Sequence, residues 1–306
     1  MALAELRNVT TTTGSTIRPA DEDLDLFGIT HQGKVRSENQ DVFLVCTVHP
    51  QVVVHGTSLA DTEELPLRGT RLATILVVAD GVGGVAGGSA AARIATEAVT
   101  RYVTSTLRCY HAAGSAGEGE FLGALRAAAL EAHDAVRAEA AASLDQQHMA
   151  STLTVGIAVW PWFYAMQVGD SRCYFFADGA LRQITRDQTI GQDLVDQGVI
   201  PADQLERSPL KDVLSSAIGS EEALPDVTRV DIGKRGCVLL LCSDGLTKHV
   251  NDDEIASYLG AMSSSEQVSR DLVELALARG GSDNITIVVG RACLGSRNSG
   301  PVPRAK

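Results

Sequence analysis

Residues 152–181 read TLTVGIAVWPWFYAMQVGDSRCYFFADGAL, and the architecture of the chain can be inferred outward from this stretch. It contains three apolar runs rich in β-branched and aromatic residues, as buried strands require: Thr152–Trp160, Tyr164–Val168 and Cys173–Ala177. The connections between the runs are short, and Asp178-Gly179 after the third run is a typical hairpin turn. Because parallel strands need much longer crossovers, the stretch predicts antiparallel pairing.

The flanking sequence adds further strands and several long helices. Apolar runs predict strands at Ala73–Ala79, Cys237–Cys242 and Ile285–Val289. Segments rich in alanine and leucine predict helices at Ser89–Leu107, Glu120–Ala142 and Ser265–Arg279. In the second helix, one stripe suited to face the core is formed by Phe121, Leu125, Ala129 and Ala132. Since two long helices follow one another and the strands come as hairpins, we expect an α+β fold with helices packed outside antiparallel sheets.

Composition and charge exclude several classes of function. The chain has 306 residues, of which 44% are apolar and 21% charged, so it can bury a sizeable core. Its formal net charge of −12 repels nucleic acid and anionic lipid, so we expect neither as a partner. A phosphate-bearing substrate would have to be attracted locally, by a bound cation or a well-placed arginine.

Cysteine usage and the N-terminal sequence favour the cytoplasm. The six cysteines form no CxxC pair and lie mostly in apolar stretches, where free cysteine acts as a small hydrophobic residue. We interpret them as reduced thiols. Met1–Asp25 has no signal-peptide pattern, and no apolar run approaches the ~20 residues of a membrane helix. The sequence predicts a cytoplasmic protein, and we expect a monomer.

The domain organisation is simple. Residues 1–24 are rich in threonine and acidic groups and predict a flexible leader. Residues 293–306 are similarly polar, contain two prolines, and predict a flexible tail. No linker rich in proline, glycine or serine divides the middle of the chain, so we expect one domain over residues 25–292.

Four aspartates stand close to glycine at the ends of apolar strands. Asp80 and Asp244 each follow a strand and precede a glycine, Asp170 lies between two strands, and Asp283 comes just before one. Aspartate is short, so a strand end can hold its carboxylate in place. Carboxylate oxygens are the ligands that Mg²⁺ and Mn²⁺ prefer. The pattern therefore suggests a site for a hard divalent cation.

The same residues also allow a plainer interpretation. A glycine beside an aspartate lets backbone approach a ligand, so the Gly81 carbonyl could bind a cation. An Asp-Gly pair is equally a common turn, which is what we expect of Asp178-Gly179. Because spacing alone does not show that the four aspartates converge, a metal site and a set of turns remain alternatives at this level.

Six motifs in a fixed order extend the argument: Gly33–Asp41, Asp80–Gly84, Ser151–Thr154, Gly169–Arg172, Ser243–Leu246 and Asp283–Thr286. Together they resemble the metal-dependent protein phosphatases, the type 2C serine/threonine phosphatases, particularly their bacterial branch. The resemblance spans Phe27–Val289. It implies an antiparallel β-sandwich of two sheets flanked by helices, in α-β-β-α layers, with metals in a cleft at one end. It also implies a flap near the active site, formed by Asp187–Ser220.

The resemblance assigns roles to the aspartates. It implies that Asp80 bridges two Mn²⁺ or Mg²⁺ ions. Asp244 and Asp283 would complete the shell of one ion, and the Gly81 carbonyl would bind the other. Asp170 matches a residue at a third, weaker metal site, which Asp244 shares.

Two catalytic residues follow from the same resemblance. Arg36 matches an arginine that binds phosphate, and its planar fork can hold two phosphate oxygens as lysine cannot. Asp41 resembles the group that orients metal-bound water. The implied reaction is hydrolysis of phosphoserine and phosphothreonine by a two-metal-activated water, without a phosphoenzyme. The implied partners are phosphorylated proteins in a bacterial signalling pathway, a serine/threonine kinase or its substrates among them.

The chain departs from the family pattern in a few places. Gln40 stands where many members have glutamate, and Val82 stands where eukaryotic members have a histidine thought to act as general acid. The stretch Cys46–Arg71 is longer than in minimal relatives, and its Val52–Val54 run suggests an extended sheet edge, a partner surface or a variable hairpin. We expect a surface or structural role for His31.

Three other functions compete with the phosphatase. The first is a catalytically weak or silent module of the same fold that binds phosphoproteins. Such modules typically lose a core aspartate, but Asp80, Asp244 and Asp283 are all present. The second is a hydrolase of small phosphoesters. The third is a structural cation site, which would leave Arg36 in its motif without an explanation.

Overall fold

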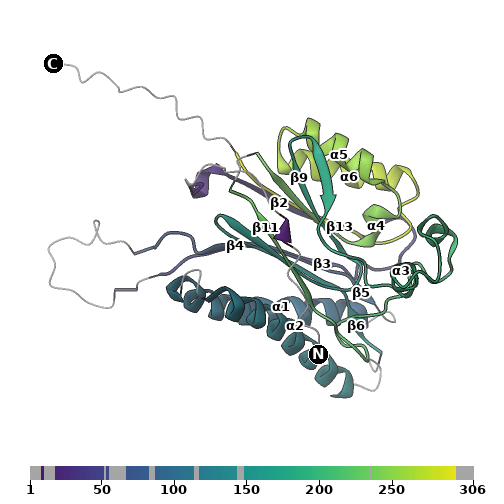
Figure 1. Ribbon diagram of the computed structural model, residues 1–306, viewed down its shortest axis with the longest axis horizontal. Helices are drawn as coiled ribbons and strands as arrows, with labels where there is room; N and C mark the ends of the chain where they lie inside the picture. The colour runs from purple at the N-terminus through teal and green to yellow at the C-terminus, as the bar shows by residue number, and fades with distance from the viewer. Residues whose placement is uncertain are drawn as a thin grey trace.

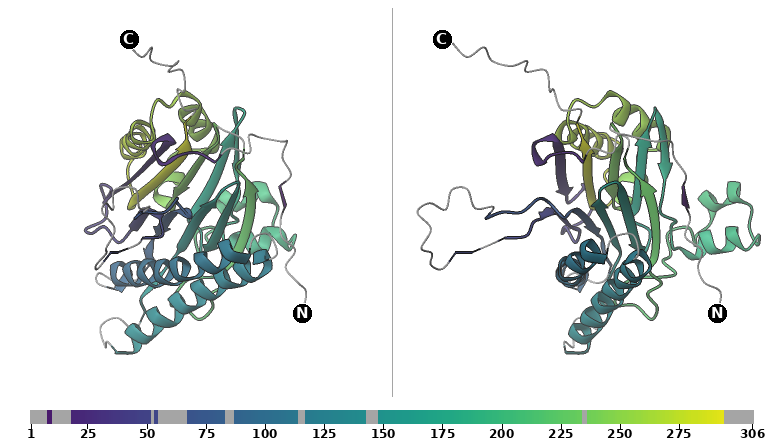
Figure 2. Two further views of the ribbon diagram at one scale, coloured as in Figure 1. Left: turned by 90° about the vertical axis from the view of Figure 1, so that its left-hand side faces the viewer. Right: turned by 60° about the vertical axis from the view of Figure 1, so that its left-hand side comes forward.

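Two β-sheets lie face to face, and helices cover the outer face of each (Figures 1 and 2). The structure is a computed structural model that describes residues 8–9, 18–51, 53–54, 67–82, 87–113, 117–142, 148–233 and 236–293. The layers follow the order helix, sheet, sheet, helix, which confirms the predicted α+β sandwich.

The first sheet has six strands in the order β1-β11-β8-β7-β4-β3. Its strands are β1 (Asn8–Val9), β11 (Asp226–Asp231), β8 (Trp162–Val168), β7 (Leu153–Val159), β4 (Ala73–Ala79) and β3 (Val42–Val48). The short strand β1 pairs in parallel with β11, and the other neighbours are antiparallel. Strand β5 (Gly81–Val82) pairs separately with β6 (Ala150–Ser151) beside this sheet.

The second sheet has five antiparallel strands in the order β10-β9-β12-β13-β2. Its strands are β10 (Ala180–Gln183), β9 (Arg172–Ala177), β12 (Val238–Cys242), β13 (Ile285–Ala292) and β2 (Leu24–His31). Asp178, in the turn between β9 and β10, has a positive φ of 53° and precedes Gly179 at 78°. The predicted hairpin is therefore confirmed, with Asp-Gly as its turn.

Two groups of helices form the outer layers. Helices α1 (Gly87–Ala113) and α2 (Glu118–Ala142) cover the first sheet, with their long axes side by side in Figure 2. Helices α4 (Asp244–Thr247), α5 (Asp252–Ala261) and α6 (Ser265–Ala278) cover the second sheet. The α2 stripe predicted from the sequence is buried at all four positions, as a core-facing helix requires.

The central strand β4 explains the layering. All seven of its residues are buried, and alternate side chains face opposite layers. Ile75 and Val77 belong to the core that α1 and α2 cover. Leu76 and Val78 belong to the core between the two sheets. Because each such side chain stabilises the fold by about 1.5–3 kcal/mol on burial, a strand with large apolar side chains on both faces is stable only between two layers.

The flap segment leaves the sandwich after β10 and returns before β11. It contains α3 (Ile190–Asp196) and a 3-10 turn, η3 (Ala202–Arg207). Thr189 caps α3 by accepting a hydrogen bond from the Gln192 N–H. Gly198, just beyond the helix, has a φ of 71°, the left-handed conformation that glycine commonly adopts where a helix ends.

Part of the predicted leader contacts the domain. The Arg71 guanidinium donates to the Pro19 carbonyl over 2.9 Å and forms an ion pair with Asp21. In the predicted insertion Cys46–Arg71, Gln51 and Arg68 form an isolated bridge, while residues 52 and 55–66 lie outside the described residues. Val53 and Val54 are exposed and belong to no strand.

Candidate metal centre and active site

Four strand ends meet at one end of the sandwich. Strand β12 ends at the edge where β9 and β13 begin, because both neighbours run antiparallel to it. Asp244 follows β12 and therefore lies near Asp170, which precedes β9, and Asp283, which precedes β13. Asp80 follows β4 of the facing sheet. All four aspartates line one cleft of about 560 Å³, together with Arg36.

Asp80 is fixed in place through its backbone. Its N–H donates to Thr152 Oγ1 over 3.0 Å, and its carbonyl accepts from the Thr152 N–H at 2.8 Å and the Ser151 hydroxyl at 3.0 Å. Loss of hydration, followed by the charges of Asp41 and Asp244, raises the pKa of the Asp80 carboxyl well above its usual value. Such a carboxylate needs a proton or a cation beside it.

Gly81, the next residue, tolerates no side chain. A Cβ atom at this position would lie 2.3 Å from the Gly88 carbonyl oxygen and 2.8 Å from that of Gln40. The close approach of these backbone segments explains the glycine after Asp80, and Gly81 itself lines the cleft.

Asp41 lies behind the wall of the cleft and is buried. Its Oδ2 accepts hydrogen bonds from Ser243 Oγ at 2.8 Å and Thr286 Oγ1 at 2.7 Å. Burial raises its pKa to about 6, although these two hydroxyls work in the opposite direction. The negative charge of Asp41 in turn helps to raise the pKa of Asp80, because the two carboxyl groups lie close together.

Asp170 is the second carboxyl with a strongly raised pKa. Burial, and then the negative charges of Asp244 and Asp187, raise its pKa to about 8. Burial also raises the pKa of Asp244, against the opposing charge of Lys248. The cleft therefore concentrates carboxylates that repel one another. Such an arrangement is typical of a functional site, where a cation between the carboxylates can offset the repulsion.

Asp283 differs because two cations contact it. Arg36 Nε lies 2.7 Å from Oδ1, and the Lys248 ammonium lies 2.8 Å from Oδ2. Burial works to raise the pKa of Asp283, but the hydrogen bonds from Arg36 and Lys248 outweigh it and lower the pKa. The Lys248 ammonium also lies 2.6 Å from Asp244 Oδ2, so it bridges the two aspartates.

The donor set of the cleft suits a hard divalent cation. Its ligands are carboxylate oxygens, which Mg²⁺ and Mn²⁺ prefer. Asp41 Oδ1 and Asp244 Oδ1 are buried without a hydrogen-bond partner in the described part of the chain, and buried oxygens of this kind call for a partner. Within the described ranges, no three acidic, histidine or cysteine side chains converge as tightly as a metal requires. The ion pairs of Asp283 with Arg36 and Lys248 would therefore rearrange on metal uptake.

The opening motif is attached to the end of β13 through Asn284. Its side-chain amide donates to the Gln32 and Glu38 carbonyls, each over 2.8 Å, and its oxygen accepts from the Gln40 N–H at 2.9 Å. These bonds hold the loop that carries Arg36 over the cleft. Neighbouring His31 is exposed, and its Nδ1 accepts from the Gly33 N–H at 2.9 Å, in agreement with a structural role.

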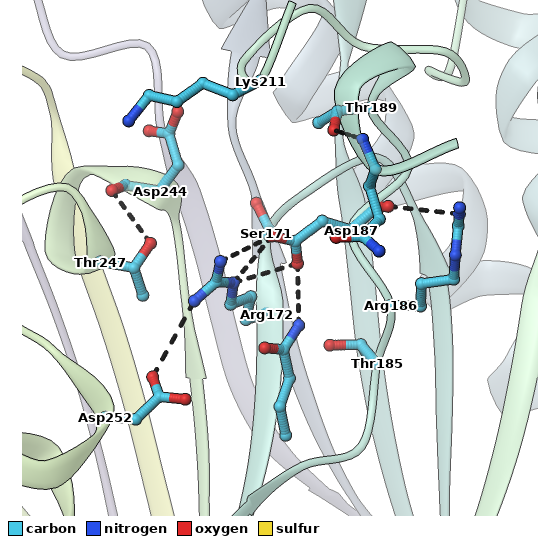
Figure 3. A network of polar contacts seen from close by, with 12 residues as sticks. Ser171, Arg172, Thr185, Arg186, Asp187, Thr189, Lys211, Asp244, Thr247 and Asp252 are labelled. Atoms are coloured by element: carbon cyan, nitrogen blue, oxygen red, sulfur yellow. Dashed lines mark hydrogen bonds and ion pairs between the residues drawn. The ribbon is translucent and has the colours of Figure 1, made fainter. Parts of the chain in front are cut away.

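The flap is attached to the strand that follows Asp170. Figure 3 shows the Arg172 guanidinium directed at Asp187, which it contacts from Nε and Nη2 over 2.7–3.0 Å. Arg172 also donates to the Tyr174 hydroxyl at 3.0 Å. Further along, Arg186 pairs with Asp193 at 2.6 Å, on the first turn of α3. One end of the flap is thereby fixed to the second sheet.

Several residues of the cleft were missed by sequence reasoning. The flap contributes Asp212 and Leu214, and the end of α4 contributes Lys248. Lys248 has a simple signal, because it stands four residues after Asp244 and a helical turn places those positions together. Asp212 and Leu214 carry no such signal, since only the path of the flap brings them to the cleft. Val82 also lines the cleft, is 42% exposed, and offers no proton.

Known proteins share this fold and about a third of the aligned residues. The family model described as protein phosphatase 2C matches residues 64–278. The chain is 34% identical over 234 residues to the serine/threonine protein phosphatase PstP of Mycobacterium tuberculosis, which covers 76% of this chain and 43% of that protein. It is 31% identical over 215 residues to the serine/threonine phosphatase stp of Listeria welshimeri, which covers 70% of this chain and 83% of that protein. The chain belongs to the protein phosphatase 2C family.

Solved structures agree with this membership. A crystal structure of M. tuberculosis PstP matches with a TM-score of 0.71 at 29% identity, covering 89% of this chain and 99% of that one. A structure of the PstP catalytic domain in complex with two manganese ions matches with a TM-score of 0.67 at 28% identity, with the same coverage. The chain spans less than half the length of the PstP sequences, at 43%.

Proposed function

We propose that this chain is a metal-dependent phosphatase that hydrolyses phosphoserine and phosphothreonine in proteins. One observation carries the proposal: Asp80, Asp170, Asp244 and Asp283 line a single cleft with Arg36. The family and the two manganese ions of the related PstP catalytic domain support it. The cofactor would be Mn²⁺ or Mg²⁺, as two ions with a third, weaker site.

The proposal assigns the metal ligands as follows. Asp80, Asp244, Asp283 and the Gly81 carbonyl would hold the two ions, and Asp170 would share a weaker site with Asp244. When bound, the ions supply Lewis-acid activation of a water and neutralise charge on the phosphate. The buried, unpartnered Oδ1 of Asp244 and the raised pKa values of the surrounding carboxyls support this assignment.

The chain's own residues perform the remaining steps. The Arg36 guanidinium, released from Asp283, would hold two phosphate oxygens and stabilise the negative charge of the transition state. Asp41, which the Ser243 and Thr286 hydroxyls hold beside Asp80, would orient the reacting water. Since Val82 offers no proton, the leaving hydroxyl would take its proton from solvent in the open cleft.

The shape of the site supports a protein substrate. The cleft is open and is lined by the exposed side chain of Val82, and exposed Val35 and Val213 are each next in sequence to a lining residue. A phosphorylated segment of a serine/threonine kinase, or of its substrates, would satisfy both the charge and this apolar rim. We further propose a cytoplasmic, monomeric enzyme. None of the helices in the described ranges is long and apolar enough to cross a membrane.

The test is hydrolysis of a phosphothreonine peptide by the full chain with Mn²⁺, and again with excess chelator. The expected result is phosphate release that needs the metal and far exceeds release from small phosphate monoesters. Preference for small monoesters would favour the second candidate, a general phosphoesterase. No release from several phosphopeptides by folded, Mn²⁺-loaded protein would favour the silent binding module.

A further inference from the structure

Lys248 is a cation inside the cluster of carboxylates, and the proposed function gives it no role. It follows the last residue of α4 as its C-cap, and its backbone N–H donates to the Asp244 carbonyl over 2.8 Å. One turn of helix thereby places its side chain beside the carboxylate of Asp244. The ammonium reaches both Asp244 Oδ2, at 2.6 Å, and Asp283 Oδ2, at 2.8 Å.

These two oxygens belong to carboxylates that the proposed function assigns to the metal ions. An ammonium that donates to a carboxylate oxygen occupies a lone pair that a cation would otherwise use. It also repels a divalent cation placed a few ångströms away. The Lys248 side chain is 28% exposed, so screening by water is incomplete. Lys248 and an incoming metal therefore compete for Asp244 and Asp283.

The number of acidic side chains in the cleft is consistent with a role for the Lys248 ammonium in compensating their negative charge. Seven carboxyl groups gather in and behind it: Glu38, Asp41, Asp80, Asp170, Asp212, Asp244 and Asp283. The Lys248 ammonium contacts two of them directly. It therefore supplies positive charge that a metal ion at Asp244 and Asp283 would otherwise supply.

We propose that Lys248 acts as a fixed internal cation that weakens divalent-metal binding at Asp244 and Asp283. The proposal rests on the metal site of the proposed function. The metal shares or displaces the ammonium when it binds. When the metal leaves, the ammonium returns to the two aspartates and keeps their negative charge compensated.

The experiment titrates Mn²⁺ into the chelator-treated full chain, with calorimetry for affinity and electron paramagnetic resonance for the number of bound ions. Lys248→Met keeps an unbranched side chain only one atom shorter and removes its charge. We expect it to bind Mn²⁺ at least about tenfold more tightly than wild type. Lys248→Arg keeps the charge and should remain within about threefold of the wild-type affinity.

Controls separate this inference from the proposed function. Arg93→Met removes one positive charge from an exposed ion pair on α1, with Glu97, and should leave Mn²⁺ affinity unchanged. Circular dichroism confirms that each variant is folded. Equal or weaker Mn²⁺ binding by Lys248→Met, or tighter binding by Lys248→Arg, would overturn the role of Lys248. Failure of the wild-type chain to bind Mn²⁺ would instead overturn the metal site itself.

Discussion

Arg36 and Asp283 form a two-point ion pair although they lie 247 positions apart in the sequence. Arg36 Nε is 2.7 Å from Oδ1, and one terminal nitrogen is 2.8 Å from Oδ2. The guanidinium that we assign to phosphate therefore holds a carboxylate that we assign to a metal. A metal on Asp283 would free Arg36, so metal binding should prepare the phosphate site.

The first prediction concerns this guanidinium. Arg36→Lys keeps the charge but loses the planar pair of donors, so KM for a phosphothreonine peptide should rise about tenfold with a smaller change in kcat. Steady-state kinetics at saturating Mn²⁺ measure both constants. Arg93→Lys on α1 is the matched control and should behave as wild type. A KM for Arg36→Lys within twofold of wild type would argue against phosphate binding by Arg36.

Much of the fold could be predicted because most of its strands are short runs of apolar and β-branched residues. Strand β4 has the bounds expected from the sequence, since a run with apolar side chains on both faces is buried between two layers. The turn at Asp178 was equally predictable from the left-handed backbone that Asp-Gly supplies. The ion pair between Arg71 and Asp21 could not be predicted, because it depends on how the chain crosses the edge of the sandwich.

The candidate site was predictable only in part. The aspartates were visible as acidic strand ends, and the structure brings Asp80, Asp170, Asp244 and Asp283 to one cleft. Their convergence depends on strand order, which the acidic pattern does not contain. The bond between Arg36 and Asp283 was missed for the same reason. The roles of the aspartates in metal binding and of Arg36 in phosphate binding are predictions that the Mn²⁺ and kinetic measurements test.

The second prediction concerns pH. Asp170 has a folded pKa of about 8 against an ordinary value of 3.8, so the folded metal-free protein holds a proton that the unfolded chain releases. Stability from this group is present at low pH and is lost as pH rises toward 8. Asp170→Asn should therefore raise the melting temperature of chelator-treated protein at pH 8.

Thermal unfolding at several pH values measures this effect. The difference between Asp170→Asn and wild type should shrink toward pH 5, where Asp170 is already protonated. A difference that is equal at pH 5 and pH 8 would contradict the raised pKa.

The third prediction concerns metal removal. Mn²⁺ at a hundred times its dissociation constant should stabilise the wild-type chain by about 2.7 kcal/mol, because it binds only the folded site. Asp244→Asn should lose most of this gain. Asp178→Asn is the matched control, since it makes the same change in the β9–β10 turn, where asparagine tolerates the positive φ. Denaturant unfolding with and without Mn²⁺ measures the gain, and full stabilisation of Asp244→Asn would exclude that residue as a ligand.

The fourth prediction concerns the flap. Arg172→Met removes the bonds to Asp187 and Tyr174, and should lower the free energy of unfolding by about 2 kcal/mol. Amide hydrogen exchange should also accelerate across residues 187–214 more than in the helices. Arg270→Met breaks an exposed helical ion pair with Glu266 and is the control. It should not accelerate amide exchange across residues 187–214. Unchanged exchange in the flap would show that Arg172 does not anchor it.

The central claim is that the aspartate cluster, with divalent ions bound, hydrolyses phosphoproteins. The most direct measurement is the single-turnover rate of phosphate release from a phosphothreonine peptide at saturating Mn²⁺, for Asp244→Asn and Asp178→Asn. We predict a rate at least about a hundredfold below wild type for Asp244→Asn and a wild-type rate for Asp178→Asn. Wild-type turnover by folded Asp244→Asn would contradict the claim.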